Sequence, residues 1–563
     1  MKKTLLISLT AAALLANEEV ALETITVESS SLSDVSTEEI KSADTAEVLA
    51  KQVPSITLVR RSGIANDIIL RGQKRDNINV LVDGGKIYGA CPNRMDPPTS
   101  HVITGNIDSI SVIEGPYDVE NFGTLSGLVS VETVKPEAGV HGNLNAGVGS
   151  FGYKKVAGTV SGGNDTVRGL IGVSGEWSDQ YEDGDGNTFA EQIDEAVAAG
   201  EAMGAAAFLP SERDRAAYAK KSLMAKLFVN LTDNQELRLG YTANRSDGVL
   251  YPNSMMDAEY DNSDLYNVQY IAKDLGSLSK EFSAKYYYSY VDHPMWTKWR
   301  TVSVAKGFVA TNHLTSTIQG ATLKNTTALT DTYDLTVGLD GSLRNWDGQY
   351  DHDGTVVGPS IDDADTRNLA AFLELEKRYE NAALKLGVRY DNTEITSGND
   401  ALPDNDYQSV GANLFADYQT TPYLGFFGGI GTASRVPDAR ELYFQKNGSV
   451  IGTPDLDQTT NYEADLGMKN TYDAFNLKTR MFYSKLQNYI YYNASQSANV
   501  FENIDATIYG FEISGSWYMS ESVYVDFGAA WQRGTKDNAL TDQNNTNLAD
   551  IPPLKGNVAF NWN

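Results

Sequence analysis

The residues with the most distinctive chemistry in this sequence are a cysteine and a methionine four positions apart. Cys91 is the only cysteine among 563 residues, and Met95 follows it in the stretch 89–100. Cysteine and methionine sulfur are soft ligands that favour Cu(I), zinc or iron–sulfur chemistry over hard cations. Because Pro92 can begin a helical turn and Pro97 must end it, we expect one turn that places both sulfurs on one side. Both residue types are also common as core packing, so this stretch alone leaves two interpretations open.

The composition indicates a large β-structure and excludes several classes of protein. The chain has 31 tyrosines, 49 glycines and 16 prolines, which suits strands and turns better than helices. Its net charge of −29 argues against nucleic acid as a partner, because a phosphate backbone attracts lysine and arginine. No apolar run of about 18 residues occurs beyond the N-terminus, which excludes transmembrane helices, whereas alternating strands remain compatible with an outer membrane.

The N-terminus has the pattern of an export signal. Lys2 and Lys3 precede the apolar run 4–16, and acidic residues follow it. This order predicts a signal peptide over residues 1–16, with cleavage after Ala16. Export places the chain in an oxidising compartment, where a single cysteine is free, joined to another molecule or bound to a metal.

Residues 17–43 contain one β-prone segment followed by a polar linker. The segment alternates apolar and polar residues and consists of Leu22, Glu23, Thr24, Ile25, Thr26 and Val27. A short strand on a tether is suited to pairing with a partner, because main-chain hydrogen bonds then supply the affinity. A stray β-prone segment in a tail has the same pattern, so the segment alone leaves both interpretations open.

Residues 44–136 are expected to form a compact α+β domain. A short helix over 45–53 is stopped by Pro54. Strands that end in glycine or proline turns are predicted over residues 68–73, 78–84, 109–116 and 127–133.

From residue 137 onward the pattern changes to repeated amphipathic strands with polar turns. Predicted hairpins pair residues 223–230 with 236–244 and 369–377 with 383–391. Polar, glycine-rich interruptions over 182–213 and 346–365 are predicted to be long loops, which are extracellular in an outer-membrane barrel. The region 137–563 is therefore expected to form one large barrel.

Four short motifs give the chain a resemblance to a known family. They are the segment 22–27, Leu70-Arg71-Gly72, Val82-Asp83-Gly84 and Ile113-Glu114-Gly115-Pro116. In this order and spacing they resemble the TonB box and the plug domain of the TonB-dependent outer-membrane receptors. The resemblance implies a transmembrane β-barrel of the 22-stranded type in the bacterial outer membrane, in contact with its lipid, with the α+β plug in the lumen.

The resemblance extends to the sulfur motif. The run from Cys91 to Met95 is similar to the hallmark of the family's copper receptors, which pair CxxxM with an HxM sequence on the barrel. His293-Pro294-Met295 is the only HxM sequence in the chain. The resemblance therefore implies a metal site made of Cys91, Met95, His293 and Met295.

Strand periodicity indicates independently where the HxM residues lie. Side chains alternate along a strand, so the even residues from Phe282 to Tyr290 form an aromatic face for lipid and the odd ones from Ser283 to Val291 a polar face for the lumen. Continuing the count puts His293 and Met295 on the lumen face, with Pro294 between them on the other. Three sulfurs and one imidazole form a soft set that favours Cu(I). An ordinary tyrosine-rich strand with an incidental histidine is the alternative.

Other candidates carry weaker signals. Met255 and Met256 offer a transit path for copper, although a methionine pair is more often packing. The sequence has no nucleophile–base arrangement and no phosphate-binding or dinucleotide-binding motif. We therefore expect neither an enzyme nor an organic cofactor.

Together these features predict TonB-dependent import of copper across the outer membrane. The resemblance implies that TonB, energised by its inner-membrane complex, pairs with residues 22–27 and pulls on the plug. One alternative is a receptor of the same kind for a siderophore or other metal chelate. A second is a copper-binding surface protein that transports nothing.

The C-terminal end departs from the family's pattern. Residues 551–556 resemble a segment that in the family precedes several further strands and a terminal aromatic residue, but this sequence ends at Asn563. The region 137–563 is short for a barrel of 22 strands, and an open barrel edge is not viable in lipid. We therefore expect this barrel to lack its last strands.

Overall fold

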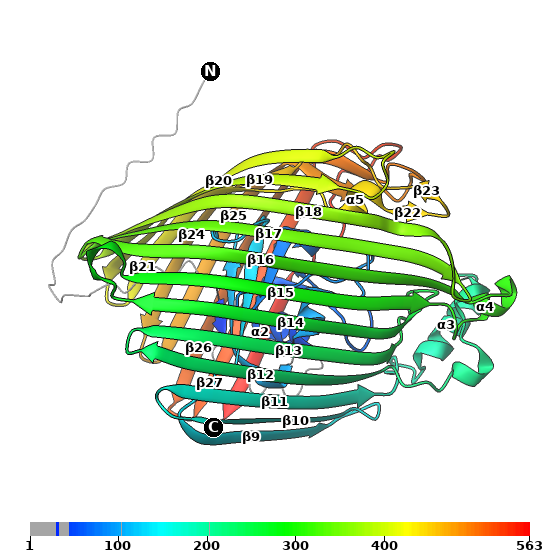
Figure 1. Ribbon diagram of the computed structural model, residues 1–563, viewed down its shortest axis with the longest axis horizontal. Coiled ribbons are helices and arrows are strands. Elements are labelled where there is room, and N and C mark those ends of the chain that lie inside the picture. The colour runs from blue at the N-terminus through cyan, green and yellow to red at the C-terminus, as the bar shows by residue number, and fades with distance from the viewer. Residues whose placement is uncertain (1–29, 33–43, 103, 202, 563) are drawn as a thin grey trace.

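The structure is a computed structural model that describes residues 30–32, 44–102, 104–201 and 203–562. A barrel of long strands encloses a smaller α+β domain, so the predicted fold class is confirmed (Figure 1). Every helix in this described part of the chain is too short or too polar to cross a lipid bilayer. The predicted signal peptide 1–16 and the β-prone segment 22–27 lie outside the described residues.

The inner domain is built from one helix and two small sheets. Helix α2 (Thr45–Gln52) begins at Asp44, whose side chain accepts a hydrogen bond from Glu47 N–H, and it ends just before Pro54. The larger sheet has the order β1 (Ser30–Leu32), β7 (Ile107–Glu114), β8 (Gly127–Thr133), β5 (Ile78–Val82) and β6 (Gly85–Lys86). The smaller sheet consists of β2 (Ile56–Val59), β3 (Asp67–Leu70) and β4 (Gln73–Lys74).

Eighteen antiparallel strands form the wall around this domain, where the resemblance implied the 22-stranded type. They are β9 (Gly139–Val148), β10 (Lys154–Gly163), β11 (Val167–Ser178), β12 (Tyr218–Thr232), β13 (Gln235–Val249), β14 (Asp257–Lys273), β15 (Glu281–Trp296), β16 (Ala310–Thr330), β17 (Tyr333–His352), β18 (Thr355–Arg378), β19 (Ala382–Thr396), β20 (Asn405–Thr421), β21 (Leu424–Arg435), β24 (Thr459–Tyr472), β25 (Phe475–Tyr492), β26 (Phe501–Ser520), β27 (Val523–Lys536) and β28 (Lys555–Trp562). In the described residues β9 pairs with β10 and β28 pairs with β27, so these two strands stand at the two ends of the strand order. Apolar side chains on them are open to the surroundings, with Val140 87% and Trp562 81% exposed.

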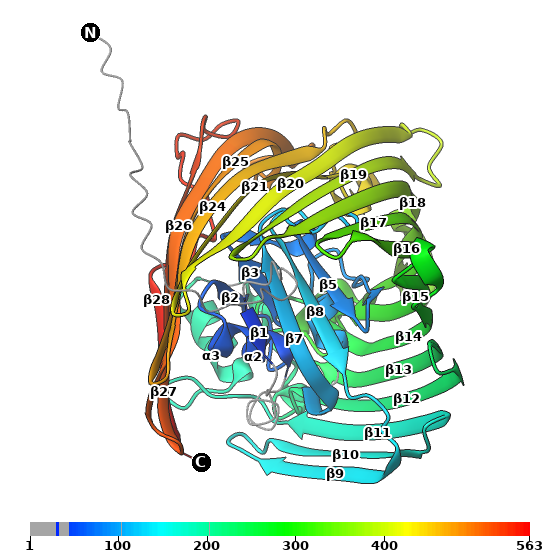
Figure 2. The same ribbon diagram turned by 90° about the vertical axis from the view of Figure 1, so that its left-hand side faces the viewer.

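The two ends of the barrel differ in their connections. One end carries α3 (Phe189–Ala198), α4 (Thr301–Lys306), α5 (Ala439–Tyr443) and the small hairpin of β22 (Gln445–Lys446) and β23 (Ser449–Val450), whereas short turns join the strands at the other (Figure 1). Seen along the barrel, the sheet of β5, β7 and β8 lies inside the ring of strands (Figure 2).

Both predicted hairpins are confirmed, but one predicted loop is wrong. β12 pairs with β13 and β18 with β19 over the expected residues. Residues 346–365, predicted to be a loop, instead continue β17 and β18 to a tight turn at Asp353 and Gly354. Both turn residues have positive φ, 51° and 82°, which is the geometry of an Asp-Gly hairpin turn. The polar composition of this region therefore reflects strands that extend beyond the wall. The other predicted loop, 182–213, contains α3.

Packing and buried charge hold the plug inside the barrel. The main plug core extends to Leu265, Val291 and Leu314 of the barrel wall. A network of charged side chains joins the two parts: Arg71 of the plug lies 3.0 Å from Asp465 and 3.3 Å from Glu114. Arg480 of the barrel lies 2.7 Å from Asp465 and 3.2 Å from Glu114. Each charge is paired, which offsets the cost of its removal from water.

Candidate metal centre

The loop that carries Cys91 is shaped by the carboxylate of Asp96. Its Oδ1 accepts the Cys91 N–H at 2.9 Å, and its Oδ2 accepts the Ala90 N–H at 2.5 Å. Arg94 N–H donates to the Cys91 carbonyl at 2.9 Å, and Arg94 has a φ of 57°. The predicted helical turn is wrong, because left-handed backbone at Arg94 makes a tight turn that a helix cannot accommodate. Burial raises the pKa of the Asp96 carboxyl, while the N–H donor of Ala90 opposes this rise.

The barrel holds this loop at both ends of the CxxxM motif. Trp346 Nε1 of β17 donates to the Ala90 carbonyl at 2.7 Å. The Tyr251 hydroxyl donates to the Met95 carbonyl at 2.5 Å. Because both contacts involve main-chain oxygens, they position the motif without using its sulfur atoms.

His293 and Met295 lie on β15, facing the lumen, as the strand periodicity predicts. Ser289 on the same face donates to the Lys86 carbonyl of the plug at 3.1 Å, and Tyr286 on the opposite face is 43% exposed. The pairing of β14 with β15 shifts register between Ala258 and Asn262, opposite Pro294. Proline cannot donate to a sheet, and such bulges redirect neighbouring side chains.

The structure brings the four predicted residues together in the interior. Cys91, Met95 and Met295 belong to one buried cluster and are 4%, 6% and 4% exposed. His293 is fully buried, and its imidazole interacts with the Cys91 thiol. Soft donors from the plug and from the barrel wall therefore converge on one region.

The His293 imidazole lacks ordinary hydrogen bonds. Its Nδ1 lies 3.3 Å from Oδ1 of Asp261, yet within the described residues neither ring nitrogen forms a hydrogen bond of normal geometry. Such buried polar groups are costly unless a further partner satisfies them. An imidazole in this state beside sulfur donors fits the chemistry of a soft metal ion.

Two carboxylates beside His293 were missed by the sequence analysis. Asp96, Asp261 and His293 each offer a potential ligand atom within 4.8 Å of the others. Asp96 follows Met95 directly in the sequence, so its place near the predicted metal ligands can be inferred from the sequence. Asp261 has no such signal, because its place opposite His293 depends on the register in which β14 pairs with β15, as in the neighbouring pair Asn262–Asp292.

The segment between β11 and β12 covers the cluster at the end with the long connections. Phe189, Ala190 and Ile193 of α3 pack on the same buried cluster as the sulfurs. A buried arginine secures this cover: Arg300 donates to Asp257 at 2.6 Å and to the Ala206 carbonyl at 2.8 Å, 3.7 Å from the ring of Phe208. The sulfurs are therefore screened from the surroundings by protein.

The predicted transit methionines differ in their surroundings. Met256 is partly buried and packs against the cluster that contains Cys91. Met255 beside it is 39% exposed. The pair therefore spans the distance from the surface to the edge of the cluster.

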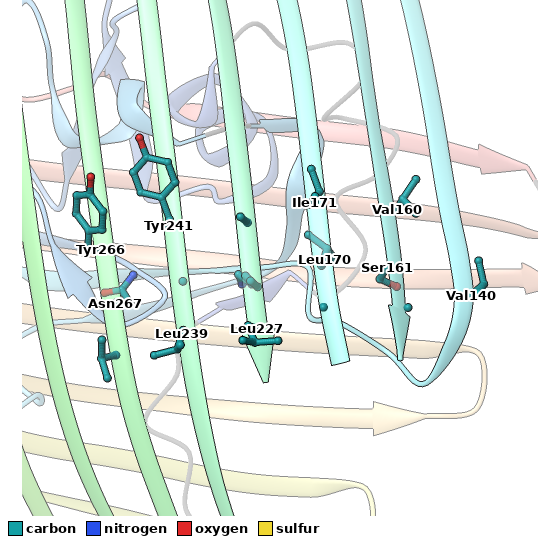
Figure 3. Close-up of a pocket in the computed structure, with 16 residues that line it drawn as sticks. Val140, Val160, Ser161, Leu170, Ile171, Leu227, Leu239, Tyr241, Tyr266 and Asn267 are labelled. Atoms are coloured by element: carbon teal, nitrogen blue, oxygen red, sulfur yellow. The ribbon is translucent and has the colours of Figure 1, made fainter. Parts of the chain in front are cut away.

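Hollows elsewhere do not coincide with these residues. A shallow apolar hollow of about 780 Å³ lies across strands β9–β14, where Val160, Ile171 and Tyr266 project from the wall (Figure 3). These side chains are 63%, 59% and 45% exposed, so the hollow is on the outside of the barrel. Between plug and wall, a cavity of about 40 Å³ is lined by residues that include Asp76, Tyr88 and Arg344.

Comparison with protein families matches both parts of the molecule. Residues 158–563 match a family described as TonB dependent receptor-like, beta-barrel. Residues 22–127 match one described as TonB-dependent Receptor Plug Domain. The comparison with curated protein sequences found no match.

Solved structures with the same fold differ in their cargo. A structure described as copper transporter OprC has a TM-score of 0.80 and 22% identity, covering 93% of this chain and 83% of its own. The FrpB iron transporter from Neisseria meningitidis has a TM-score of 0.70 and 15% identity, covering 90% and 81%. The ferric yersiniabactin uptake receptor FyuA from Yersinia pestis has a TM-score of 0.70 and 13% identity, covering 95% and 83%.

Proposed function

We propose that this chain, which belongs to the TonB-dependent receptors of the bacterial outer membrane, imports copper. Members of this family are transporters rather than enzymes, and they interact with TonB. The family therefore establishes a receptor with TonB as its general partner. The cargo, the metal ligands and the steps of transport are our proposal.

One observation carries the choice of copper: three sulfur side chains gather in the interior beside His293, whose ring nitrogens form no hydrogen bond of normal geometry with the described part of the chain. We assign Cys91, Met95, His293 and Met295 as ligands of the transported ion. A set of three sulfurs and one imidazole favours Cu(I) over the harder iron(III), which prefers oxygen. The similarity to a structure described as a copper transporter supports this choice.

A receptor for a siderophore or other chelate is the second candidate, favoured by the similarity to iron and siderophore receptors. An organic chelate needs a pocket of about 300–1,000 Å³. The cavity beside Asp76 and Tyr88 measures about 40 Å³, and protein packs closely around the sulfurs. These dimensions favour an ion over a chelate.

Division of the ligands between two parts of the molecule suggests how the ion is released. Cys91 and Met95 belong to the plug, whereas His293 and Met295 belong to the wall. Affinity supplied by several ligands implies slow dissociation, so release without an energy input would be slow. We propose that TonB, energised at the inner membrane, pairs with residues 22–27, moves the plug and thereby separates the two pairs of ligands.

Metal analysis of the purified receptor tests the ligand set. We expect the wild-type receptor, loaded with Cu(I) under reducing conditions, to retain one copper ion per chain. The variants Cys91→Ala and His293→Ala should retain almost none. Met224→Leu is the matched control, because Met224 is fully buried in the barrel but belongs to a different cluster. Stoichiometric copper in Cys91→Ala would overturn the assignment, and loss of copper in Met224→Leu would show that the loss is not specific to the site.

Deletion of residues 22–27 separates import from simple binding. We expect the deletion variant to bind copper as the wild type does and to lose copper uptake in cells that express TonB. A surface protein that only sequesters copper would show no difference in cellular uptake after this deletion. Unchanged uptake would therefore favour that alternative.

We also propose that Met256 passes copper towards the site. Met256 contacts the buried cluster, whereas Met255 is exposed beside it. We expect Met256→Leu to slow copper loading while the final stoichiometry stays the same. The matched control is Met481→Leu, because Met481 is 61% exposed on the barrel at β25. Equal loading rates in both variants would exclude the path.

A further inference from the structure

Asp261 is the buried acid whose surroundings the proposed ligand set does not explain. It lies on β14, is 5% exposed, and its Oδ1 has no hydrogen bond of normal geometry within the described residues. A basic group, the His293 imidazole, lies beside it, with Nδ1 at 3.3 Å from Oδ1. Burial of a carboxylate is costly, so its place beside the histidine requires a reason.

The two acids near His293 have different surroundings. Asp96 uses both carboxylate oxygens to accept the backbone N–H groups of Ala90 and Cys91, so it shapes the plug loop. Asp261 belongs to the barrel wall, as His293 does. Two other basic groups lie near Asp261: Lys220 donates to the Ser100 carbonyl at 2.7 Å, and His101 has its Nε2 3.3 Å from the Asp96 carbonyl oxygen. His293 is the basic group whose ring nitrogen lies 3.3 Å from Asp261 Oδ1.

An imidazole beside a carboxylate has one favourable arrangement as a metal ligand. An ionised carboxylate only accepts hydrogen bonds, so a neutral imidazole beside it carries its proton on the facing nitrogen, here Nδ1. The lone pair then lies on Nε2, the opposite ring nitrogen. Carboxylates in this position fix the orientation of a metal-binding histidine and increase its basicity.

We propose that Asp261 is a positioning residue for His293: its carboxylate accepts the Nδ1–H group and presents Nε2 to the ion held by the sulfurs. The inference rests on the proposed copper function and adds a residue to it. The pairing of the two strands is the structural device, because the pair Asn262–Asp292 and its antiparallel register place Asp261 of β14 opposite His293 of β15. In the absence of Asp261, the imidazole can rotate or bind through either nitrogen.

Copper affinity and copper X-ray absorption of the full-length receptor test the proposal together. We expect Asp261→Ala to weaken Cu(I) binding about 10–100-fold in competition with a Cu(I) chelator. Its absorption spectrum should keep the sulfur scattering and lose or broaden the imidazole scattering. Asp261→Asn should remain within a few-fold of wild type, because its amide oxygen can still accept the Nδ1–H group.

Asp264→Ala is the matched control on the same strand. Asp264 bonds to the Tyr241 hydroxyl at 2.7 Å and to Arg245 at 2.9 Å, on the other side of the wall, and we expect wild-type copper affinity. Folding is checked by the mobility of unheated protein on a gel, and Asp261→Ser gives the same test if the alanine variant does not fold.

Three outcomes would overturn the proposal. Unchanged affinity and imidazole scattering in Asp261→Ala would show that Asp261 has no effect on His293. Loss of oxygen scattering with imidazole scattering retained would make Asp261 a direct ligand. Equal losses in Asp261→Asn and Asp261→Ala would show that hydrogen-bond acceptance is not its role. Failure of the wild type to bind copper would instead reject the proposed function.

Discussion

Asp44 at the start of α2 shows how burial and hydrogen bonding compete at one carboxylate. Its oxygens accept the Glu47 N–H at 3.1 Å and the Asn66 N–H and side-chain amide, both at 3.0 Å. Donors of this kind favour the charged form. Burial nevertheless dominates and raises the pKa of Asp44 to about 6. The Asp44 carboxylate thus caps the helix, but it takes up a proton at a higher pH than an exposed aspartate does.

This pKa predicts a pH-dependent contribution to stability. Because the pKa of Asp44 is higher in the folded state than in the unfolded state, the folded state binds more protons between about pH 4 and pH 6. This contribution to the free energy of unfolding is fully present below pH 4 and is lost as the pH rises through 6. The loss is at most about 3 kcal/mol. We expect Asp44→Asn to keep the cap and remove this dependence. The measurement is urea unfolding in detergent at pH 4 and pH 7 for both proteins, and equal pH dependence in the two would contradict the assignment.

At the scale of elements, the cover over the sulfur cluster depends on one buried ion pair. Arg300 and Asp257 are both fully buried, and Asp257 also accepts the Tyr251 N–H at 2.9 Å. Tyr251 in turn donates to the Met95 carbonyl. The pair therefore connects the β13–β14 and β15–β16 connections to the plug loop.

Removal of Arg300 should be strongly destabilising. Arg300→Ala leaves Asp257 buried without its countercharge, which costs about 3–5 kcal/mol. The matched control is Arg367→Ala, since Arg367 is 57% exposed beside Glu394, where such pairs contribute about 0–1 kcal/mol. Thermal unfolding in detergent measures both. A shift in Arg300→Ala no larger than in the control would show that the pair is not a significant support.

The connection between β17 and β18 illustrates how a short turn decides the form of a whole element. Asp353 and Gly354 both have the positive φ of a hairpin turn, so the strands on either side continue to pair beyond the wall. The polar side chains of residues 346–365 suit this position because the projecting part of the hairpin is surrounded by water. Composition alone therefore gave the wrong element here.

At the scale of the whole molecule, the plug is joined to the wall by buried charge as well as by apolar packing. Arg71 and Arg480 share the carboxylates of Glu114 and Asp465, and Arg71 also pairs with Glu463. All five side chains are at most 3% exposed. Such a network is stable only while every charge keeps its partners.

Loss of Arg71 should therefore loosen the plug. We expect Arg71→Ala to leave an excess of buried negative charge and to raise ion conductance through the barrel in planar bilayers. Arg60→Ala is the control, because Arg60 is 48% exposed and pairs with Glu47 within the plug. Equal conductance in Arg71→Ala and wild type would show that apolar packing alone retains the plug.

Local patterns were sufficient for much of the fold and part of the site. The alternation along residues 282–291 predicted that His293 and Met295 face the lumen, because strand side chains alternate with a period of two whatever the partner strands are. The end of α2 followed from Pro54. The family motifs identified a barrel, a plug and a CxxxM sequence that the resemblance pairs with HxM.

Tertiary structure decided what surrounds those residues. Cys91 and His293 meet because the plug has a fixed position along the barrel axis. That position depends on the register of many strand pairs together. Asp261 lies opposite His293 because of the register in which β14 pairs with β15, and Asp96 accepts the Cys91 N–H in a loop where Arg94 adopts left-handed backbone. The sequence by itself determined which donors exist and which face they take, because these are local properties. The partners of each donor depend on contacts between distant segments, so only the folded chain fixed them.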